Sequence, residues 1–201
     1  MSGRRVKIGI IGCGNISKAY ILTAQSFPIL EIASVADMDV DRAKAKAREF
    51  SLPRGCSVDD ILADTDIELL VNLTVPKAHG EIALAALKSG KHVYNEKPLG
   101  ATVGEGKHIL DAAASAGLRV GCAPGTFLGG GLQTCRQIID SGAIGKPIAA
   151  TAFMTTPGHE RWHPSPEFYY EPGGGPMLDM GPYLSLIHIS EPTRLRRISY
   201  A

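Results

Sequence analysis

The stretch that decides the fold lies near the start of the chain and reads VKIGIIGCGNIS, residues 6–17. Its first half, Val6–Ile11, is an apolar run broken only by Lys7 and Gly9. Such a run is typical of a strand buried on both faces of a parallel sheet. After the glycines, apolar residues recur at helical spacing as far as Phe27. The stretch therefore predicts a strand, a tight glycine turn and a helix.

The turn itself has the spacing G-x-G-x-x-S, with Gly12, Gly14 and Ser17 at the three small positions. Gly12 permits the tight turn, Gly14 lets a pyrophosphate approach the backbone, and the small Ser17 allows the helix to pack closely on the strand. The N–H groups at the start of the helix would face the phosphates. We therefore expect this loop, including Asn15 and Ile16, to bind a dinucleotide. The alternative is a glycine turn that binds nothing.

An acidic residue, Asp37, ends the next expected strand, 25 positions after Gly12. A carboxylate there accepts both ribose hydroxyls of an adenosine and repels a 2′-phosphate. Met38 offers no charge for such a phosphate. The pattern therefore favours NAD over NADP.

Expected strands alternate with helices as far as residue 122, which indicates a doubly wound parallel sheet covered on both faces. We assign residues 1–123 to an NAD(P)-binding Rossmann domain of the α/β class. The expected strands cover residues 6–11, 30–36, 69–75, 92–94 and 118–122, and the expected helices include residues 16–27, 39–50, 76–89 and 102–116, with a short helix capped by Ser57 and Asp60.

The character of the chain changes after Pro124, where we expect an incomplete second domain over residues 124–183. It holds a helix ending before Gly142, a strand at residues 147–155 and a loop rich in proline and glycine. Residues 184–194 resemble a translated transposase adapter used in sequencing libraries. We expect residues 184–201 to be a non-native read-through tail, the alternative being a genuine final strand at 184–189.

Composition excludes several function classes. The 21 Lys and Arg residues are dispersed among 20 Asp and Glu residues, so there is no basic stripe for nucleic acid. The four cysteines are too scattered for a zinc site or a disulfide framework, which favours reduced thiols in a cytoplasm. No apolar run approaches the ~20 residues of a membrane-spanning helix, so we expect a soluble protein.

Polar residues lie at the carboxyl ends of two further expected strands, in Asn72–Pro76 and in Tyr94–Pro98. Ligands of open α/β sheets bind outside the carboxyl ends of the strands. Lys97 would therefore face the cofactor crevice. A lysine whose pKa is perturbed in such a crevice is a candidate for catalysis.

In combination, four motifs resemble the Gfo/Idh/MocA family, the group of glucose–fructose oxidoreductase and inositol dehydrogenase. They are the Gly12–Ser17 loop, Asn72–Pro76 with His79, the triplet Glu96-Lys97-Pro98, and Gly173–Tyr183. The resemblance implies a second α+β domain with an open, mostly antiparallel sheet, a sugar or polyol substrate, and a full-length protein that forms homo-oligomers.

The resemblance also assigns roles to residues. Lys97 would transfer the substrate proton, Asp179 matches the active-site aspartate, and Tyr183 stands where many members have histidine. Gly125 replaces an aspartate found in many relatives. Further residues implied to contact the cofactor are Asn72, Thr74, Pro76, His79, Glu96 and Lys97 itself.

Two other function classes compete with this hypothesis. His159–His163 has the H-E-x-x-H pattern of zinc hydrolases, but Pro157 and Pro164 leave room for only about one helical turn, so we expect no metal site there. His159, Trp162 and His163 would instead pack or contact sugar in a substrate-facing loop. The other alternative is a dinucleotide-binding sensor or scaffold without catalysis.

Overall fold

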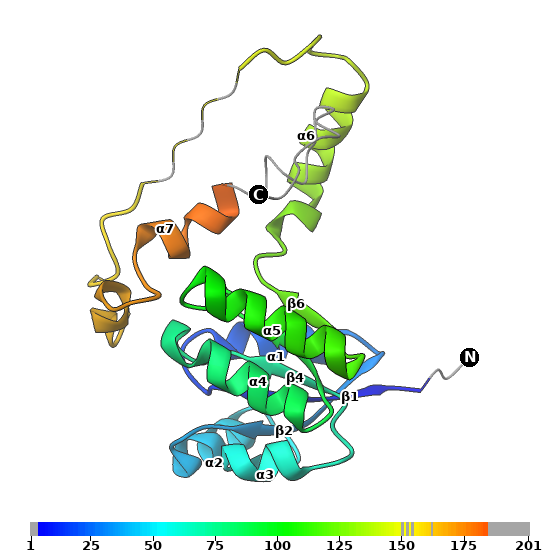
Figure 1. Cartoon of the computed structure of the whole chain (residues 1–201), viewed down its shortest axis with the longest axis vertical. Helices are drawn as coiled ribbons and strands as arrows, with labels where there is room; N and C mark the ends of the chain where they lie inside the picture. Colours follow the sequence, from blue (N-terminus) through cyan, green and yellow to red (C-terminus); the bar gives the residue numbers. More distant parts are fainter. Residues whose placement is uncertain (1–3, 150, 152, 154, 162, 185–201) are drawn as a thin grey trace.

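The computed structural model describes residues 4–149, 151, 153, 155–161 and 163–184. In this part of the chain, six parallel strands form one sheet in the order β3-β2-β1-β4-β5-β6 (Figure 1). The strands are β1 (Val6–Ile11), β2 (Leu30–Ala36), β3 (Gly55–Cys56), β4 (Leu69–Asn72), β5 (His92–Asn95) and β6 (Val120–Cys122). The expected doubly wound Rossmann fold is confirmed.

Helices cover both faces of this sheet. They are α1 (Ser17–Ser26), α2 (Val40–Glu49), α3 (Val58–Ala63), α4 (His79–Lys88) and α5 (Val103–Ala116). One buried cluster joins the sheet to α1 and α2, and a second joins it to α3, α4 and α5. Because β1 is enclosed by both clusters, its Ile8, Ile10 and Ile11 are at most 2% exposed, which explains the uninterrupted apolar run in the sequence.

The direction of winding reverses between β1 and β4, which are hydrogen-bonded neighbours. At such a switch point the loops after the two strands run in opposite directions and leave a crevice outside the carboxyl edge of the sheet. The glycine loop after β1 and the Thr74 loop after β4 meet there. The fold therefore places the expected cofactor residues beside one crevice.

Several elements differ from the expectations. β4 ends at Asn72 rather than Val75, because the Thr74 N–H donates to the Asn72 side chain (3.2 Å) instead of to a neighbouring strand. The helix expected from Pro76 begins with a 3₁₀ turn, η1 (Pro76–Ala78). β3 was not expected. It has only two residues, too few to show the alternation of apolar and polar side chains that predicts a strand.

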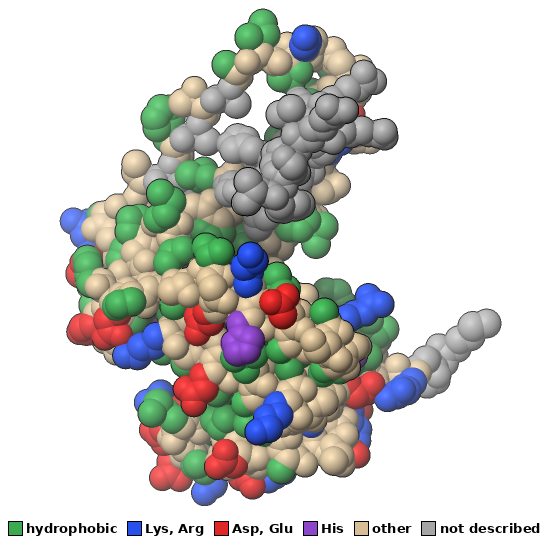
Figure 2. Space-filling view, in the orientation of Figure 1, with side chains coloured by type: hydrophobic (Ala, Val, Ile, Leu, Met, Phe, Trp, Pro, Cys, Tyr) green, Lys and Arg blue, Asp and Glu red, His purple; other side chains and the backbone are tan. Residues whose placement is uncertain are grey.

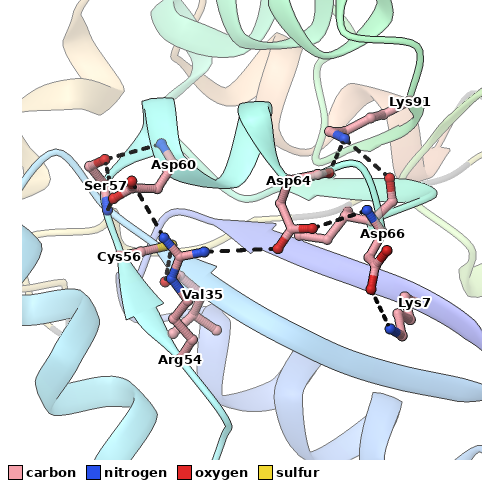
Figure 3. Close-up of polar contacts among 10 residues, drawn as sticks. Lys7, Val35, Arg54, Cys56, Ser57, Asp60, Asp64, Asp66 and Lys91 are labelled. Carbon is pink, nitrogen blue, oxygen red and sulfur yellow. Dashed lines mark hydrogen bonds and ion pairs between the residues drawn. The ribbon is translucent and has the colours of Figure 1, made fainter.

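A polar network ties α3 to the strands around it (Figure 3). The buried Lys91 ammonium donates to the carbonyl oxygens of Asp64 (2.5 Å) and Ile67 (3.2 Å). Arg54 lies 3.4 Å from Asp60 and 3.9 Å from Asp64. These contacts close the α3–β4 connection at the edge away from the crevice, and burial lowers the pKa of Lys91.

Beyond β6 the chain leaves the sheet through the 3₁₀ turn η2 (Thr126–Leu128) and α6 (Gly130–Asp140), which stands apart from it (Figure 1). It returns through η3 (Pro166–Tyr170) and α7 (Pro176–Asp179). We expected a strand at residues 147–155, but the described residues 147–149, 151, 153 and 155 are irregular, so this prediction is wrong for them. A strand needs a neighbour for its backbone groups, whereas Ile148 and Phe153 are 96% and 87% exposed. Residues 150, 152 and 154 lie outside the described part.

The surface of the described chain mixes charges of both signs. On the face shown in Figure 2, Lys and Arg side chains lie among Asp and Glu side chains over the Rossmann domain. Among the helices that the structure describes, none is long and apolar enough to cross a membrane. The expected tail, apart from Leu184, also lies outside the described residues.

Candidate active site and cofactor cleft

The two glycines of the loop after β1 have different surroundings. Gly12 has φ +102°, and a Cβ there would meet the backbone carbon and oxygen of Leu73 at 2.6 Å. At Gly14, by contrast, a Cβ would meet no atom within 4 Å. The Ser17 hydroxyl closes the turn by donating to the Gly14 carbonyl oxygen (2.6 Å). Gly12 is therefore required by the protein itself, while Gly14 leaves open space where a pyrophosphate would approach.

Asp37 holds the glycine loop against the end of β2. Its Oδ2 accepts the Cys13 N–H (2.8 Å), its Oδ1 accepts the Asp39 N–H (3.0 Å), and the residue is 6% exposed. A carboxylate has about four acceptor positions, so capacity remains for a ribose hydroxyl. Burial and the neighbouring Asp37 raise the pKa of the Cys13 thiol to about 11, so Cys13 stays protonated.

A basic side chain also reaches this end of the cleft, which the sequence analysis missed. The Arg42 guanidinium of α2 lies 3.6 Å from Asp37 Oδ1 and 3.6 Å from Asp39. Arg42 and Lys46 both line the cavity described below. Their positions four residues apart on α2 were the available signal, because residues at that spacing share one face of a helix.

Asn72 and His79 are buried and connect the loops after β4 and β5. The Asn72 amide donates to Asn95 Oδ1 (3.1 Å) and to the His79 carbonyl oxygen (3.2 Å). The two ring nitrogens of His79 face the carbonyl oxygens of Pro98 (2.6 Å) and Thr74 (3.0 Å). Both residues are at most 1% exposed and do not line the cavity. Their contacts thus position the two loops, while Thr74 itself faces the cavity.

Glu96 connects the lysine loop to the first helix. Its Oε1 accepts the Tyr20 hydroxyl (2.6 Å) and its Oε2 accepts the Lys97 N–H (2.9 Å). Burial and the bond to Glu96 push the pKa of Tyr20 far above its ordinary value, so the phenol remains a donor. The sequence placed Tyr20 only on the apolar face of a helix, and its pairing with Glu96 required the tertiary structure.

Lys97, Asp179 and Tyr183 come together although 82 residues separate the first two. The Lys97 ammonium forms an ion pair with Asp179 Oδ1 and lies 5.7 Å from the centre of the Tyr183 ring. The two charged side chains are 18% and 15% exposed. Burial raises the pKa of Tyr183, with Lys97 opposing the shift, so its hydroxyl is a proton donor at neutral pH.

His159 adds a residue that the resemblance does not assign. Its Nε2 lies 3.4 Å from Asp179 Oδ2, while the ion pair of Lys97 is with Oδ1 of the same carboxylate. The H-E-x-x-H segment to which it belongs forms no helix in its described residues, and Trp162 lies outside them. No group of three His, Cys, Asp or Glu side chains suited to a metal ion occurs within the described chain.

Many of these groups border one cavity of about 820 Å³, whereas Gly12, Tyr20, Asp37, Asn72 and His79 do not line it. It reaches from the glycine loop, past the ends of β4 and β5, to the segment around α7. The expected site residues that line it are Gly14, Asn15, Ile16, Thr74, Pro76, Glu96, Lys97, Asp179 and Tyr183. A cleft with a glycine loop at one end and an amine, a carboxylate and a phenol at the other can bind a dinucleotide next to a proton-transfer group.

The fold and this cleft define a Rossmann protein of the dinucleotide-binding class. A family model described as an oxidoreductase family with an NAD-binding Rossmann fold matches residues 6–123, and the GFO/IDH/MocA C-terminal domain matches residues 132–187. The chain belongs to the Gfo/Idh/MocA oxidoreductase family. The second match overlaps the start of the segment expected to be a non-native tail.

Individual relatives agree with this membership. The 1,5-anhydro-D-fructose reductase of Ensifer adhaerens is 31% identical over 86% of this chain and 52% of its own length. A 3-ketoreductase from Actinomadura kijaniata, solved with NADP and TDP-benzene, gives a TM-score of 0.80 at 26% identity, over 90% of this chain and 55% of its own. A Bordetella pertussis dehydrogenase, solved with NADH and UDP-GlcNAcA, gives a TM-score of 0.66 at 26% identity, over 73% of this chain and 43% of its own length. This chain thus spans about half the length of the relatives.

Proposed function

We propose that the full protein is an NAD(P)-dependent oxidoreductase that moves a hydride between nicotinamide and a hydroxyl or carbonyl group of a sugar, polyol or related small molecule. The observation that carries this proposal is the convergence of Lys97, Asp179 and Tyr183 in the cavity that begins at the glycine loop. Reductase and dehydrogenase relatives named for sugar substrates support the reaction class.

The residues present fit a dinucleotide, because Gly14 leaves space that a side chain would fill and Asp37 has acceptor capacity left. The glycine loop with Asn15 and Ile16 would hold the pyrophosphate, and Asp37 the adenosine ribose. Thr74, Pro76, Glu96 and Lys97 would border the nicotinamide, while Asn72 and His79 support them from behind. Bound nicotinamide supplies the hydride acceptor or donor.

Proton transfer falls to Lys97. In the oxidative direction its neutral amine takes the proton of the substrate hydroxyl, and in the reductive direction its ammonium returns that proton to the oxygen. Asp179 holds the amine in place, and the Tyr183 hydroxyl is a neutral donor that can bind the same oxygen. Glu96, fixed by Tyr20, positions the backbone of this loop.

NAD remains the favoured cofactor in this proposal because Asp37 repels a 2′-phosphate. Arg42 and Lys46 on the same wall would favour that phosphate, so the selectivity is set by opposing charges. Isothermal titration of the chain with NAD⁺ and NADP⁺ tests this balance. We expect tighter binding of NAD⁺, and Asp37→Asn should narrow the difference. No heat from folded protein at millimolar NAD⁺ or NADP⁺ would contradict the cofactor assignment.

Catalysis needs a separate test in full-length protein. Lys97→Met should reduce turnover by at least 100-fold, within the range of general acid–base contributions, while NAD⁺ binding changes little. The matched control is Lys107→Met, because Lys107 is exposed on α5 outside the cavity. Unchanged turnover with Lys97→Met would favour a nucleotide-binding sensor or scaffold instead.

The organisation of the whole protein is also a proposal. We propose a Rossmann domain at residues 1–123 and part of a substrate domain at 124–183, supported by the two separate family matches. The full-length protein would work as a cytoplasmic homo-oligomer without nucleic acid, consistent with four free cysteines and a surface of mixed charge (Figure 2). Light scattering of the full-length protein measures the subunit number.

A further inference from the structure

One carboxylate serves two partners at the end of the cavity. Asp179 contacts the Lys97 ammonium through Oδ1 and His159 Nε2 through Oδ2, the second at 3.4 Å. His159 is 7% exposed and Asp179 has a side chain 15% exposed, so solvent screens the interactions only weakly. A change at His159 will therefore reach Lys97 through Asp179.

The position of the His159 ring is defined by aromatic packing. The ring stacks on Tyr169 of η3 with centroids 4.0 Å apart and planes 29° apart. Phe168 meets it edge-on at 5.8 Å. The Tyr170 hydroxyl donates to Glu160 in the adjoining part of the loop. Packing against these two rings thus holds the imidazole where its Nε2 lies 3.4 Å from Asp179 Oδ2.

We infer that His159 is a positioning residue for Lys97, acting through Asp179. This rests on the proposed role of Lys97 in proton transfer. The imidazole Nε2 beside Oδ2 holds the orientation of the carboxylate and, when it carries the ring proton, withdraws part of its negative charge. Asp179 then attracts the ammonium less strongly, and a larger fraction of Lys97 is the neutral amine that accepts a proton.

Several charged or titratable groups surround this histidine and enter the balance. Asp179 reaches it from α7 and Lys97 lies across that carboxylate. Tyr169 belongs to η3, and His163 lies on the same loop with its ring 6.4 Å away. Glu160 is the adjacent acid, and its pKa is lowered first by the Tyr170 hydroxyl and in part by His159. Asp179 contacts both His159 and the amine, whereas Tyr169 and Lys97 interact through electrostatics.

The test measures the amine directly, without cofactor or substrate. The chain is labelled with trace acetic anhydride between pH 6 and 10, and mass spectrometry gives the ratio of Lys97 to Lys107 acetylation. His159→Phe preserves a ring that can stack on Tyr169 but removes the donor. We expect the half-labelling pH of Lys97 to rise by roughly 0.5–1 unit, a three- to tenfold lower ratio near neutral pH.

Two further variants separate the polar contact with Asp179 from aromatic packing. His159→Gln supplies an amide donor without the ring and should restore most of the Lys97 labelling. His108→Phe is the matched control, since His108 is exposed on α5, and should have no effect. An unchanged ratio in His159→Phe, or equal decreases in the Phe and Gln variants, would overturn the inference.

Failure of the proposed function would look different. If Lys97→Met kept its turnover while Lys97 labelling still depended on His159, the interaction would stand and the catalytic role would not. In the full-length enzyme, His159→Phe should move the pH profile of kcat to higher pH and leave KM for NAD⁺ unchanged. A change confined to KM for NAD⁺, with the pH profile of kcat unaltered, would contradict positioning through Asp179.

Discussion

At the scale of single residues, the glycine loop separates a structural requirement from a functional one. Gly12 is confined by the Leu73 backbone and by its positive φ, so a side chain there would strain the protein itself. Gly14 has neither constraint in the protein. In the proposed function, the pyrophosphate would occupy the space beside it.

This contrast leads to a prediction for Gly14→Ala. The substitution should leave the thermal midpoint of the protein without ligand nearly unchanged, because the new methyl group meets no protein atom within 4 Å. Affinity for NAD⁺ should fall at least tenfold, since the methyl group would hinder approach of the pyrophosphate. Calorimetric titration and thermal melts measure the two effects.

Gly104→Ala provides the control, because this glycine lies in the exposed first turn of α5 with room for a methyl group. It should raise stability by up to about 1 kcal/mol through helix propensity and leave NAD⁺ affinity unchanged. Equal affinities for wild-type and Gly14→Ala protein would place the pyrophosphate elsewhere.

At the scale of elements, short polar contacts determine where helices begin and how loops are held. The sequence predicted the start of α3 from Ser57 and Asp60, and both halves of that capping box are present. The Ser57 side chain accepts the Asp60 N–H (3.1 Å), and Asp60 accepts the Ser57 N–H (3.2 Å). The Ser57 hydroxyl, which also donates to Asp60 Oδ2 (2.7 Å), and then the Ser57 N–H hold the pKa of Asp60 below its ordinary value of 3.8.

A depressed carboxyl pKa makes this stabilisation depend on pH. It is fully present above the pKa of the unfolded state and is lost as pH falls through the lower pKa of the folded state. Asp60→Asn should therefore lower the melting temperature at pH 7, and the difference from wild type should vanish in strong acid. Asp59→Asn, in the same turn but outside the capping box, should have a smaller effect. A constant difference from pH 7 to pH 2 would contradict this origin.

A second element-scale contact joins α1 to the loop after β5. Tyr20→Phe would leave Glu96 Oε1 without its 2.6 Å donor and loosen the loop that carries Lys97. We expect a loss of about 1–2 kcal/mol of stability. In the full-length enzyme, kcat should fall several-fold with little change in KM for NAD⁺.

Tyr94→Phe is the matched control for this change, because Tyr94 is the other ring of the same aromatic pair, with centroids 6.4 Å apart. Denaturant melts and steady-state kinetics separate the two variants. A Tyr20→Phe enzyme that differs from wild type only in stability would show that the contact does not position Lys97.

At the scale of the whole molecule, the cleft depends on a segment that returns to the sheet. Lys77 pairs with Glu171 at 2.8 Å, and a Cβ on Gly173 would lie 3.1 Å from the Ala101 Cβ. The Lys77–Glu171 pair is exposed, and such pairs contribute little. Close packing and the buried contact between Lys97 and Asp179 therefore hold the segment in place.

Because the cofactor cleft belongs to the folded state, binding should stabilise the protein. NAD⁺ at 100 times its Kd adds about 2.7 kcal/mol to the free energy of unfolding, so the melting temperature should rise by several degrees and increase with concentration. Gly14→Ala should shift this dependence to higher NAD⁺ concentrations. A melting temperature independent of NAD⁺ would show that the folded chain does not bind it.

Much of the Rossmann domain follows from the sequence alone. β1 and β2 occupy the predicted residues because a strand buried on both faces leaves a continuous apolar run, and Gly12, Gly14 and Asp37 are recognised by local spacing. The strand expected at residues 147–155 failed in its described residues, because pairing depends on a partner that local pattern does not reveal.

Tertiary structure determined which side chains from distant parts of the chain lie together at the cleft. Tyr20 and Glu96 lie 76 residues apart, and Lys97 and Asp179 lie 82 apart, so local periodicity carries no information about these pairs. The resemblance named Lys97 and Asp179 but not His159, whose motif suggested zinc. Only the fold placed its Nε2 3.4 Å from Asp179 Oδ2, because chain topology and packing determine which distant side chains share a carboxylate.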